Sequence, residues 1–392
     1  MTQKGGQTPM PIPEPFLIDV PEPILIDLKA RLKRARWPDQ AQDTEDWSLG
    51  WKLSYMHRLI GYWADGYDWR ERERLLNRFA QFTTDIAGQR VHFLHEKGRG
   101  PSPCPLLLSH GWPGSVVEFQ QLIPRLTDPV AYGGDPADNF TVIAPSLPGY
   151  GFSFQPGQQR SGITEIADLF ADLMHMLGYS RFASHGHDWG AAITTRLGYA
   201  HRDKLLGIHL NLLPMPREPV EAVTEEETAF NAQLAGWLRE ETGYSAIMAT
   251  RPQTLAYGLT DSPVGLAAWI VEKFQRWSDC EGDLEGHISR DTLLDNIMLY
   301  WATGAINSSF WPYHAPHHGA PLLPWGGKVT VPLGYAEFPK EILKPPRSVA
   351  EHSYADIRRW TVMKRGGHFA AMEDPDALAE EIRAFFRPLR TA

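Results

Sequence analysis

Three short segments carry residue types that could act together in a nucleophilic reaction. The pentapeptide GHDWG at positions 186–190 follows an apolar run and precedes a helical one, which places Asp188 at a strand-to-helix turn. Glycines suit such a turn because the strand and helix backbones approach closely there. A carboxylate is ionised at neutral pH, so Asp188 could attack an sp³ carbon without a base and form an ester. The structural alternative is an acidic helix cap beside glycines.

The second segment, HGWPG at positions 110–114, follows the first strong apolar run. A loop at this place can offer a backbone N–H to an oxyanion hole, and the residue after the nucleophile offers another. We expect Trp112 and Trp189 to be these donors. They would orient the carboxylate of Asp188 and then stabilise the tetrahedral anion formed when water attacks the ester. A Gly/Pro turn packed with tryptophan is the alternative.

The third segment, RGGHF at positions 365–369, lies after the last predicted strand and places His368 after Asp188 in chain order. The near-neutral pKa of imidazole suits a base that activates water. Most of the 15 histidines must be surface or structural residues, and the position after the terminal strand is what singles out His368.

An acidic partner is needed to fix the tautomer of the imidazole and stabilise its cation. Glu341, which follows a predicted strand at 328–334, is our first choice. Glu337 and Asp356 compete for the same role. Asp374 follows His368 too closely to be attractive.

The elements that must position these residues alternate between apolar runs and helical spacing. Residues 86 and 91–93 flank a turn at 87–89 and predict two short strands. Further strands are predicted at 105–108, 140–144, 182–184, 205–210, 328–334 and 359–363. Helices between them indicate crossover units and a mostly parallel sheet. The pattern predicts an α/β-hydrolase fold, with helices flanking the central sheet.

Helical spacing dominates a long block between the predicted strands at 205–210 and 328–334, including 225–241 and 266–277. A closing helix is predicted at 375–386. We therefore divide the chain into four parts. They are an N-terminal segment wrapping the core at 1–84, a first core part at 85–212, a helical cap at 213–323 and a second core part at 324–392.

Bulk properties exclude several other classes of protein. The formal net charge of −9, with scattered basic residues, argues against a nucleic-acid partner. Two cysteines are too few for a disulfide framework, and no run approaches the roughly 20 apolar residues of a membrane helix. We expect a cytoplasmic protein without a membrane contact, and we leave open a homodimer.

Taken together, the motifs resemble the microsomal-type epoxide hydrolases, a family that includes juvenile-hormone epoxide hydrolases and soluble bacterial and fungal relatives. The resemblance spans nearly the whole chain. Its most specific segments are RWPD at 36–39, YDWR at 67–70, HGWPGS at 110–115, PSLPGYGFS at 145–153, DSPVGLAA at 261–268 and GGHFAA at 366–371.

The resemblance implies that Asp188 is the nucleophile, His368 the base and Glu341, which follows a Phe-Pro pair, the acid. It also implies that Tyr244 and Tyr313 in the cap polarise the epoxide oxygen and protonate the alkoxide. The implied partners are a small-molecule epoxide and water, with no cofactor and no metal. The membrane-bound members carry an anchoring helix, whereas this chain enters the N-terminal segment at 15–16 without one, so we expect a soluble enzyme.

Two other functions compete with this interpretation. A haloalkane dehalogenase shares the fold and an Asp nucleophile followed by Trp, but it needs halide-binding N–H donors in place of tyrosines. A catalytically silent binding protein is the alternative from another class, because a fold does not fix a function. Metal chemistry through His314, His317 and His318 is disfavoured, and we interpret this Pro-flanked cluster as a loop.

Overall fold

A nine-stranded sheet forms the centre of the described part of the molecule. The computed structural model describes residues 11–41, 47–214, 219–319 and 321–390. The strand order is β1-β2-β3-β5-β4-β6-β7-β8-β9. The strands are β1 Glu14–Pro15, β2 Gln81–Ile86, β3 Gln89–Glu96, β4 Cys104–Ser109, β5 Phe140–Pro145, β6 Phe182–Gly186, β7 Leu205–Leu210, β8 Leu333–Glu337 and β9 Ile357–Val362.

The pairing from β5 to β9 is parallel, whereas β1, β2, β3 and β5 pair antiparallel. The parallel strands β5 and β6 are buried along their whole length, as expected for strands covered on both faces. The mostly parallel sheet confirms the predicted fold class. Ser109 of β4 lies opposite Gly186 of β6, so the segments that follow these two strands leave the sheet side by side.

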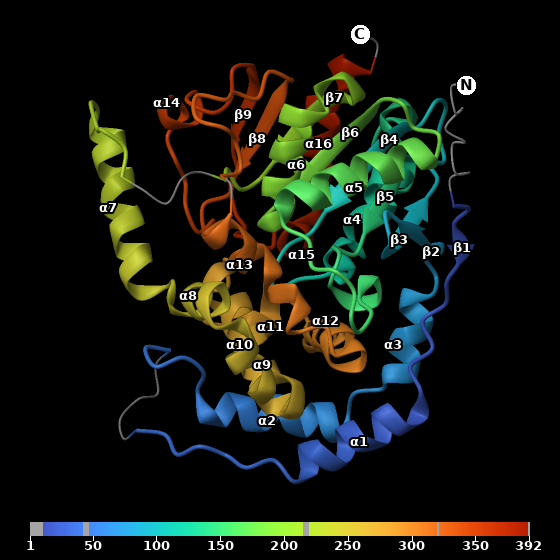
Figure 1. The fold of residues 1–392 in the computed structure, drawn as a ribbon, viewed down its shortest axis with the longest axis vertical. Coiled ribbons are helices and arrows are strands. Elements are labelled where there is room, and N and C mark those ends of the chain that lie inside the picture. Colours follow the sequence, from blue (N-terminus) through green and yellow to red (C-terminus); the bar gives the residue numbers. More distant parts are fainter. Residues whose placement is uncertain (1–10, 42–46, 215–218, 320, 391–392) are drawn as a thin grey trace, which may run out of the picture.

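Helices cover the sheet, as Figure 1 shows. Helix α5 packs beside α6, and α16 packs beside α4. Helix α5 buries residues spaced three and four apart, which is the apolar stripe expected of a helix lying on a sheet. The bounds are α4 Leu122–Thr127, α5 Ile163–Met176, α6 Trp189–Ala200, α14 Arg347–Ala350, α15 Ala370–Glu373 and α16 Pro375–Phe386.

A block of helices, which we call the cap, stands between β7 and β8 in the chain. In Figure 1 most of these yellow and orange helices gather below the sheet, while α7 extends to one side. The bounds are α7 Glu225–Glu240, α8 Gly243–Thr250, α9 Pro252–Asp261, α10 Pro263–Trp277, α11 Leu284–His287, α12 Arg290–Thr303 and α13 Trp311–His318. The cap and core share one buried apolar cluster.

The N-terminal segment joins the sheet and the cap. Strand β1 pairs with β2 at the sheet edge, and the helices α1 Glu22–Lys33, α2 Leu53–Asp65 and α3 Trp69–Leu76 run along the cap (Figure 1). Asp295 in α12 accepts hydrogen bonds from the Tyr67 hydroxyl at 2.8 Å and the Arg72 guanidinium at 2.7 Å. Because Asp295 is fully buried, these two donors supply the interactions that compensate its charge.

Two local predictions were wrong. The strand predicted at 328–334 begins only at Leu333, since Pro332 has no N–H to donate and Val329 makes only an isolated bridge to Tyr354. The cluster of His314, His317 and His318 is not a loop but the end of α13.

The opening of the chain up to residue 16 is rich in Pro and Gly, which predicts an extended segment, and residues 1–10 of it lie outside the described residues. From residue 11 onward, the short strand β1 agrees with an extended chain. Across the described ranges, no helix is both long and apolar enough to cross a bilayer.

Candidate active site

Asp188 stands at the turn between β6 and α6 in a conformation that few non-glycine residues adopt. Its φ is 49° and its ψ is −128°. The flanking glycines are required, because a Cβ at Gly186 would lie 2.1 Å from the carbonyl oxygen of Gly190. A Cβ at Gly190 would lie 1.9 Å from the carbonyl oxygen of Ser109. The turn therefore holds the Asp188 carboxylate at the N-terminus of α6, where the helix dipole favours negative charge.

The loop after β4 meets this carboxylate. The backbone N–H of Trp112 donates to Oδ1 of Asp188 at 2.7 Å. Gly111 makes room for the contact, since a Cβ there would lie 2.1 Å from the same oxygen. Burial acts to raise the pKa of the Asp188 carboxyl, but His368 and the N–H groups of Trp189 and Trp112 outweigh it, so this pKa lies below its ordinary value. Asp188 is therefore an anion at neutral pH.

The cap helix α12 fixes the loop that carries Trp112. The amide of Asn296 donates to the carbonyl of Pro113 at 2.7 Å and accepts from the Ser115 hydroxyl at 2.7 Å. The Tyr300 hydroxyl donates to the carbonyl of Gly114 at 2.6 Å.

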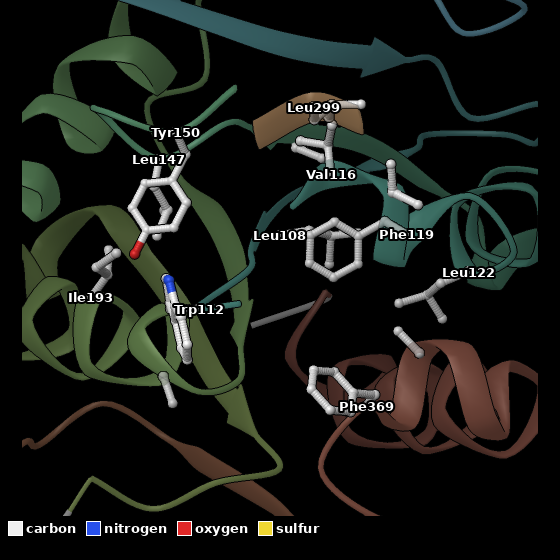
Figure 2. Close-up of a cluster of buried hydrophobic side chains, with 14 of the residues drawn as sticks. Leu108, Trp112, Val116, Phe119, Leu122, Leu147, Tyr150, Ile193, Leu299 and Phe369 are labelled. Carbon is white, nitrogen blue, oxygen red and sulfur yellow. The ribbon is translucent and has the colours of Figure 1, made fainter. Parts of the chain in front are cut away.

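The Trp112 side chain itself is buried in an apolar cluster with Leu147, Tyr150 and Phe369 (Figure 2). Packing and hydrogen bonds thus fix the N–H that faces Asp188.

His368 lies between two carboxylates. Its Nδ1 is 2.6 Å from Oε1 of Glu341, and its Nε2 is 3.5 Å from Oδ2 of Asp188. The second separation lies at the limit of a hydrogen bond, and no protein group in the described ranges makes a hydrogen bond to Nε2 with suitable geometry. His368 is fully buried, so its Nε2 is shielded from bulk solvent.

The alternatives to Glu341 have other partners. Glu337 accepts from the Trp360 indole, and Asp356 pairs with Arg358. Asp374 pairs with Arg365 and caps α16. Among these acidic residues, Glu341 is the one that contacts the His368 imidazole.

The two carboxylates determine the charge of His368. Burial acts to lower its pKa, but the charges of Glu341 and Asp188 outweigh burial and raise the pKa of His368 to about 10. The resting site therefore holds an imidazolium between two anions at neutral pH. Removal of either negative charge would lower this pKa.

The two cap tyrosines lie over the loop at 110–114 and the turn at Asp188. The ring of Tyr313 is 4.7 Å from that of Trp189 and 5.8 Å from that of Trp112, centroid to centroid. The Tyr244 ring stacks on Trp112 at 5.4 Å and is 5.6 Å from Tyr313. Helices α8 and α13 thus bring both phenols to the residues that carry the two expected N–H donors.

The environment of Tyr313 favours its neutral, proton-donating form. Burial first, and then the nearby Tyr244 and Asp188, raise the pKa of Tyr313 well above its ordinary value. Tyr244 acts on the Tyr313 hydroxyl through its charge and through a side-chain hydrogen bond, so the two phenols lie close together.

Three neighbours of the site escaped the sequence analysis. The ammonium of the buried Lys273 lies 4.6 Å from the ring centroid of Tyr244, a cation–π contact. Nε2 of His187, the residue before the candidate nucleophile, lies 2.9 Å from Oε2 of Glu118, and both residues are buried. The sequence gives no signal for Lys273 or Glu118, since spacing alone does not indicate which charged residues become buried.

The histidines of α13 make ordinary helix and cap contacts. His314 donates from Nδ1 to the carbonyl of Ala249 at 2.8 Å, and His318 donates to the carbonyl of His314 at 2.9 Å. Across the part of the chain that the structure describes, no three His, Cys, Asp or Glu side chains are grouped as a metal site requires.

Comparison with protein families yields two matches. Residues 13–119 match the family described as "Epoxide hydrolase N terminus", and residues 105–246 match the family described as "alpha/beta hydrolase fold". The first match covers the N-terminal segment and the loop that carries Trp112. The second covers the turn at Asp188 and the start of the cap.

Curated relatives match over almost the full chain. A protein of Stigmatella aurantiaca (strain DW4/3-1) that carries an epoxide hydrolase name is 45% identical, over 96% of this chain and 85% of its own. Epoxide hydrolase 1 of Oryctolagus cuniculus is 36% identical, over 95% of this chain and 88% of its own.

Solved structures agree with these relatives. The juvenile hormone epoxide hydrolase of the silkworm Bombyx mori has a TM-score of 0.88 at 32% identity and covers 97% of this chain and 95% of its own. The Aspergillus niger epoxide hydrolase has a TM-score of 0.84 at 29% identity, over 96% of this chain and 97% of its own.

Proposed function

The chain belongs to the epoxide hydrolase family, and on this premise we propose that it converts epoxides into vicinal diols through a covalent ester on Asp188. The observation that carries the proposal is the row of Glu341, His368 and Asp188, with the rings of Tyr244 and Tyr313 beside it. A nucleophile, a base with a fixed tautomer and two hydroxyl groups that donate hydrogen bonds are the groups that such a reaction needs.

In the first half-reaction, the Asp188 carboxylate attacks a ring carbon and the carbon–oxygen bond of the epoxide breaks. The departing oxygen gains negative charge, which the hydroxyls of Tyr244 and Tyr313 stabilise by hydrogen bonds. One tyrosine then gives its proton to the alkoxide. The product of this step is a hydroxyalkyl ester of Asp188 beside a tyrosinate.

Esterification also converts His368 into a base. The negative charge of Asp188 disappears, which removes one of the two charges that raise the pKa of the imidazolium. His368 can then lose its proton, which restores the neutral tyrosine. The net charge of the site is unchanged, and neutral His368 is ready to accept a proton from water.

In the second half-reaction, water attacks the carbonyl carbon of the ester and His368 Nε2 takes its proton. The backbone N–H groups of Trp112 and Trp189 stabilise the tetrahedral anion, and Glu341 stabilises the imidazolium. Collapse of the anion breaks the bond between the carbonyl carbon and the alkyl oxygen. The proton that remains on the carboxyl group passes to this oxygen, and the diol is released. Asp188 and the His368 imidazolium are regenerated.

A haloalkane dehalogenase would use the same turn but not two hydroxyl donors. Halide release from a bromoalkane, measured beside diol formation from styrene oxide, separates the two activities. Diol formation without halide release is the expected result, and strong halide release without diol would reverse the assignment. The homodimer and the cytoplasmic location remain predictions.

The proposal is tested by trapping the ester. A His368→Gln variant should still be alkylated by styrene oxide but should hydrolyse the ester very slowly, because no base activates water. Intact-mass measurement should show one added substrate, and mass measurement after digestion should find it on the peptide that contains Asp188. Asp188→Ala is the matched control and should gain no mass. Absence of an adduct on the His368→Gln variant would contradict the two-step reaction.

A further inference from the structure

The segment that follows cap helix α10 is hydrogen-bonded to the loop that carries His368. The backbone N–H of His368 donates to the carbonyl of Trp277 at 2.9 Å. The backbone N–H of Gly366 donates to Oδ2 of Asp279 at 2.9 Å. Two groups of the cap therefore hold the backbone N–H groups of Gly366 and His368, the residues on either side of Gly367.

Glu373 of α15 joins the same two segments from the core side. Its Oε2 accepts from the backbone N–H of Asp279 at 2.7 Å, and its Oε1 accepts from that of Phe369 at 2.9 Å. One carboxylate thus bridges the cap and the residue directly after His368. We call Asp279 and Glu373, with these hydrogen bonds, the cap–loop clamp.

The two segments fit each other closely. A Cβ at Gly367 would lie 2.5 Å from the carbonyl oxygen of Trp277 and 3.0 Å from the amide nitrogen of Asp279. Gly366 has a φ of +100°, which favours glycine. The Trp277 ring lies 5.2 Å from the His368 ring, and the rings of Phe274 and Phe369 stack at 4.0 Å. The loop therefore takes its path along the cap.

Catalytic groups must be held within about 0.5 Å of their working geometry, and their supporting residues set this precision. Glu341 holds one ring nitrogen of His368 but does not hold the backbone that carries the ring. We propose that Asp279 and Glu373 are positioning residues that hold His368 against the cap, so that Nε2 faces the water that hydrolyses the ester. This inference rests on the proposed function and deepens it.

The clamp should act unequally on the two half-reactions. Ring opening depends on Asp188 and the two tyrosines, which belong to the turn, α8 and α13, whereas the clamp carboxylates bind the backbone N–H groups of Gly366 and Phe369 beside His368. Ester hydrolysis depends on the line from His368 Nε2 through water to the ester carbon. A loosened loop therefore slows hydrolysis and leaves alkylation nearly intact.

The test measures both rates in single turnovers of the full chain with styrene oxide, by rapid quenching and mass spectrometry of the alkylated enzyme. Asp279→Ala and Glu373→Ala should each slow ester hydrolysis by about 10- to 100-fold, the scale of a misplaced catalytic group. The alkylation rate should stay within about twofold of the wild-type rate, a much smaller change than that in the hydrolysis rate. The ester should therefore accumulate in both variants.

Two conservative variants and one control accompany the alanine variants. Asp279→Asn keeps an acceptor for the Gly366 N–H and should restore most of the hydrolysis rate. The hydrolysis rate of Glu373→Gln should lie between those of the wild type and Glu373→Ala. These two also preserve the test should an alanine variant fail to fold. Asp283→Ala is the control, because Asp283 lies in the same cap segment but caps α11 instead of the loop.

The outcomes separate the clamp from the proposed function. Slow hydrolysis with near-normal alkylation in the Asp279 and Glu373 variants supports the clamp. Hydrolysis at the wild-type rate in folded variants, or an equal loss of both rates, overturns it. Absence of an ester even in the wild type and in His368→Gln overturns the proposed function itself.

Discussion

Nε2 of His368 lies 3.5 Å from Oδ2 of Asp188. At this separation the two groups attract each other as charges but do not form a strong hydrogen bond. The gap leaves the carboxylate free to act as a nucleophile while the imidazolium stays protonated. Esterification of Asp188 then removes the attraction and frees His368 for the second step. We therefore expect the role of His368 to change between the two half-reactions.

Changing one cap tyrosine should leave part of the activity. In Tyr244→Phe or Tyr313→Phe the remaining hydroxyl still donates to the epoxide oxygen, so the rate of alkylation should fall only partly. In the double variant this rate should fall by a factor of about 10² to 10⁴, the range of general acid catalysis. Single-turnover alkylation by styrene oxide measures the effect.

Tyr257→Phe is the control for these variants, because Tyr257 lies in the cap helix α9 and is 74% exposed. Its alkylation rate should equal that of the wild type. Equal rates for the wild type and for the double variant of Tyr244 and Tyr313 would remove both tyrosines from the mechanism.

Removing the Asn296 side chain should slow both half-reactions. Asn296→Ala leaves the Pro113 carbonyl and the Ser115 hydroxyl without their partner, which loosens the Trp112 N–H that faces Asp188. The free energy of unfolding should fall by about 1–3 kcal/mol, the cost of unpaired buried polar groups. Urea unfolding and single-turnover rates measure the two effects.

The exposed hydrogen bond between Asn307 and Gln253 provides a control, since Asn307→Ala removes an amide hydrogen bond that joins two parts of the cap. It should change neither half-reaction. Loss of ester hydrolysis alone in Asn296→Ala, with normal alkylation, would argue against a role of the Trp112 N–H in orienting the nucleophile.

His368 should make the free energy of unfolding depend on pH in the alkaline range. Its pKa rises from an ordinary 6.5 to about 10 on folding, so its contribution is fully present below pH 6.5 and is lost as the pH rises through 10. In this window the native state binds more protons than the unfolded state. The free energy of unfolding should therefore decline with pH, by at most about 1.4 kcal/mol per unit for one proton.

Other groups titrate in the same window, so the comparison is between the wild type and His368→Gln. Urea unfolding at several pH values should show the steeper decline in the wild type. Parallel declines in the two proteins would mean that His368 is not an imidazolium in the resting enzyme.

Much of the core could be predicted from the sequence because its signals are local. The strand at 205–210 and the helix at 375–386 were predicted with the bounds that the structure has. Both have a clear apolar pattern that ends at a turn or at a Pro. The strand β8 was predicted to begin five residues too early. The apolar run that contains Pro332 resembles a strand in sequence, but proline has no N–H to donate to the hydrogen bonds of a sheet.

The candidate site was predictable where residues follow predicted strands, although Glu341 was chosen there with Glu337 and Asp356 as competitors. Asp188, Trp112 and His368 fulfil this condition, whereas the positions of Tyr244 and Tyr313 came from the family resemblance alone. The clamp could not be predicted. Asp279 lies 87 positions before Gly366 and 94 positions before Glu373 in the chain. Nothing in the sequence distinguishes Asp279 and Glu373 among its 47 acidic residues.

An ester on Asp188 is tested most directly by following oxygen through a single turnover in ¹⁸O-labelled water with enzyme in excess. We expect an unlabelled diol, since its new oxygen comes from the side chain of Asp188, and a gain of one ¹⁸O in the peptide that contains Asp188. Label in the first-turnover diol, with none in that peptide, would contradict an ester on Asp188.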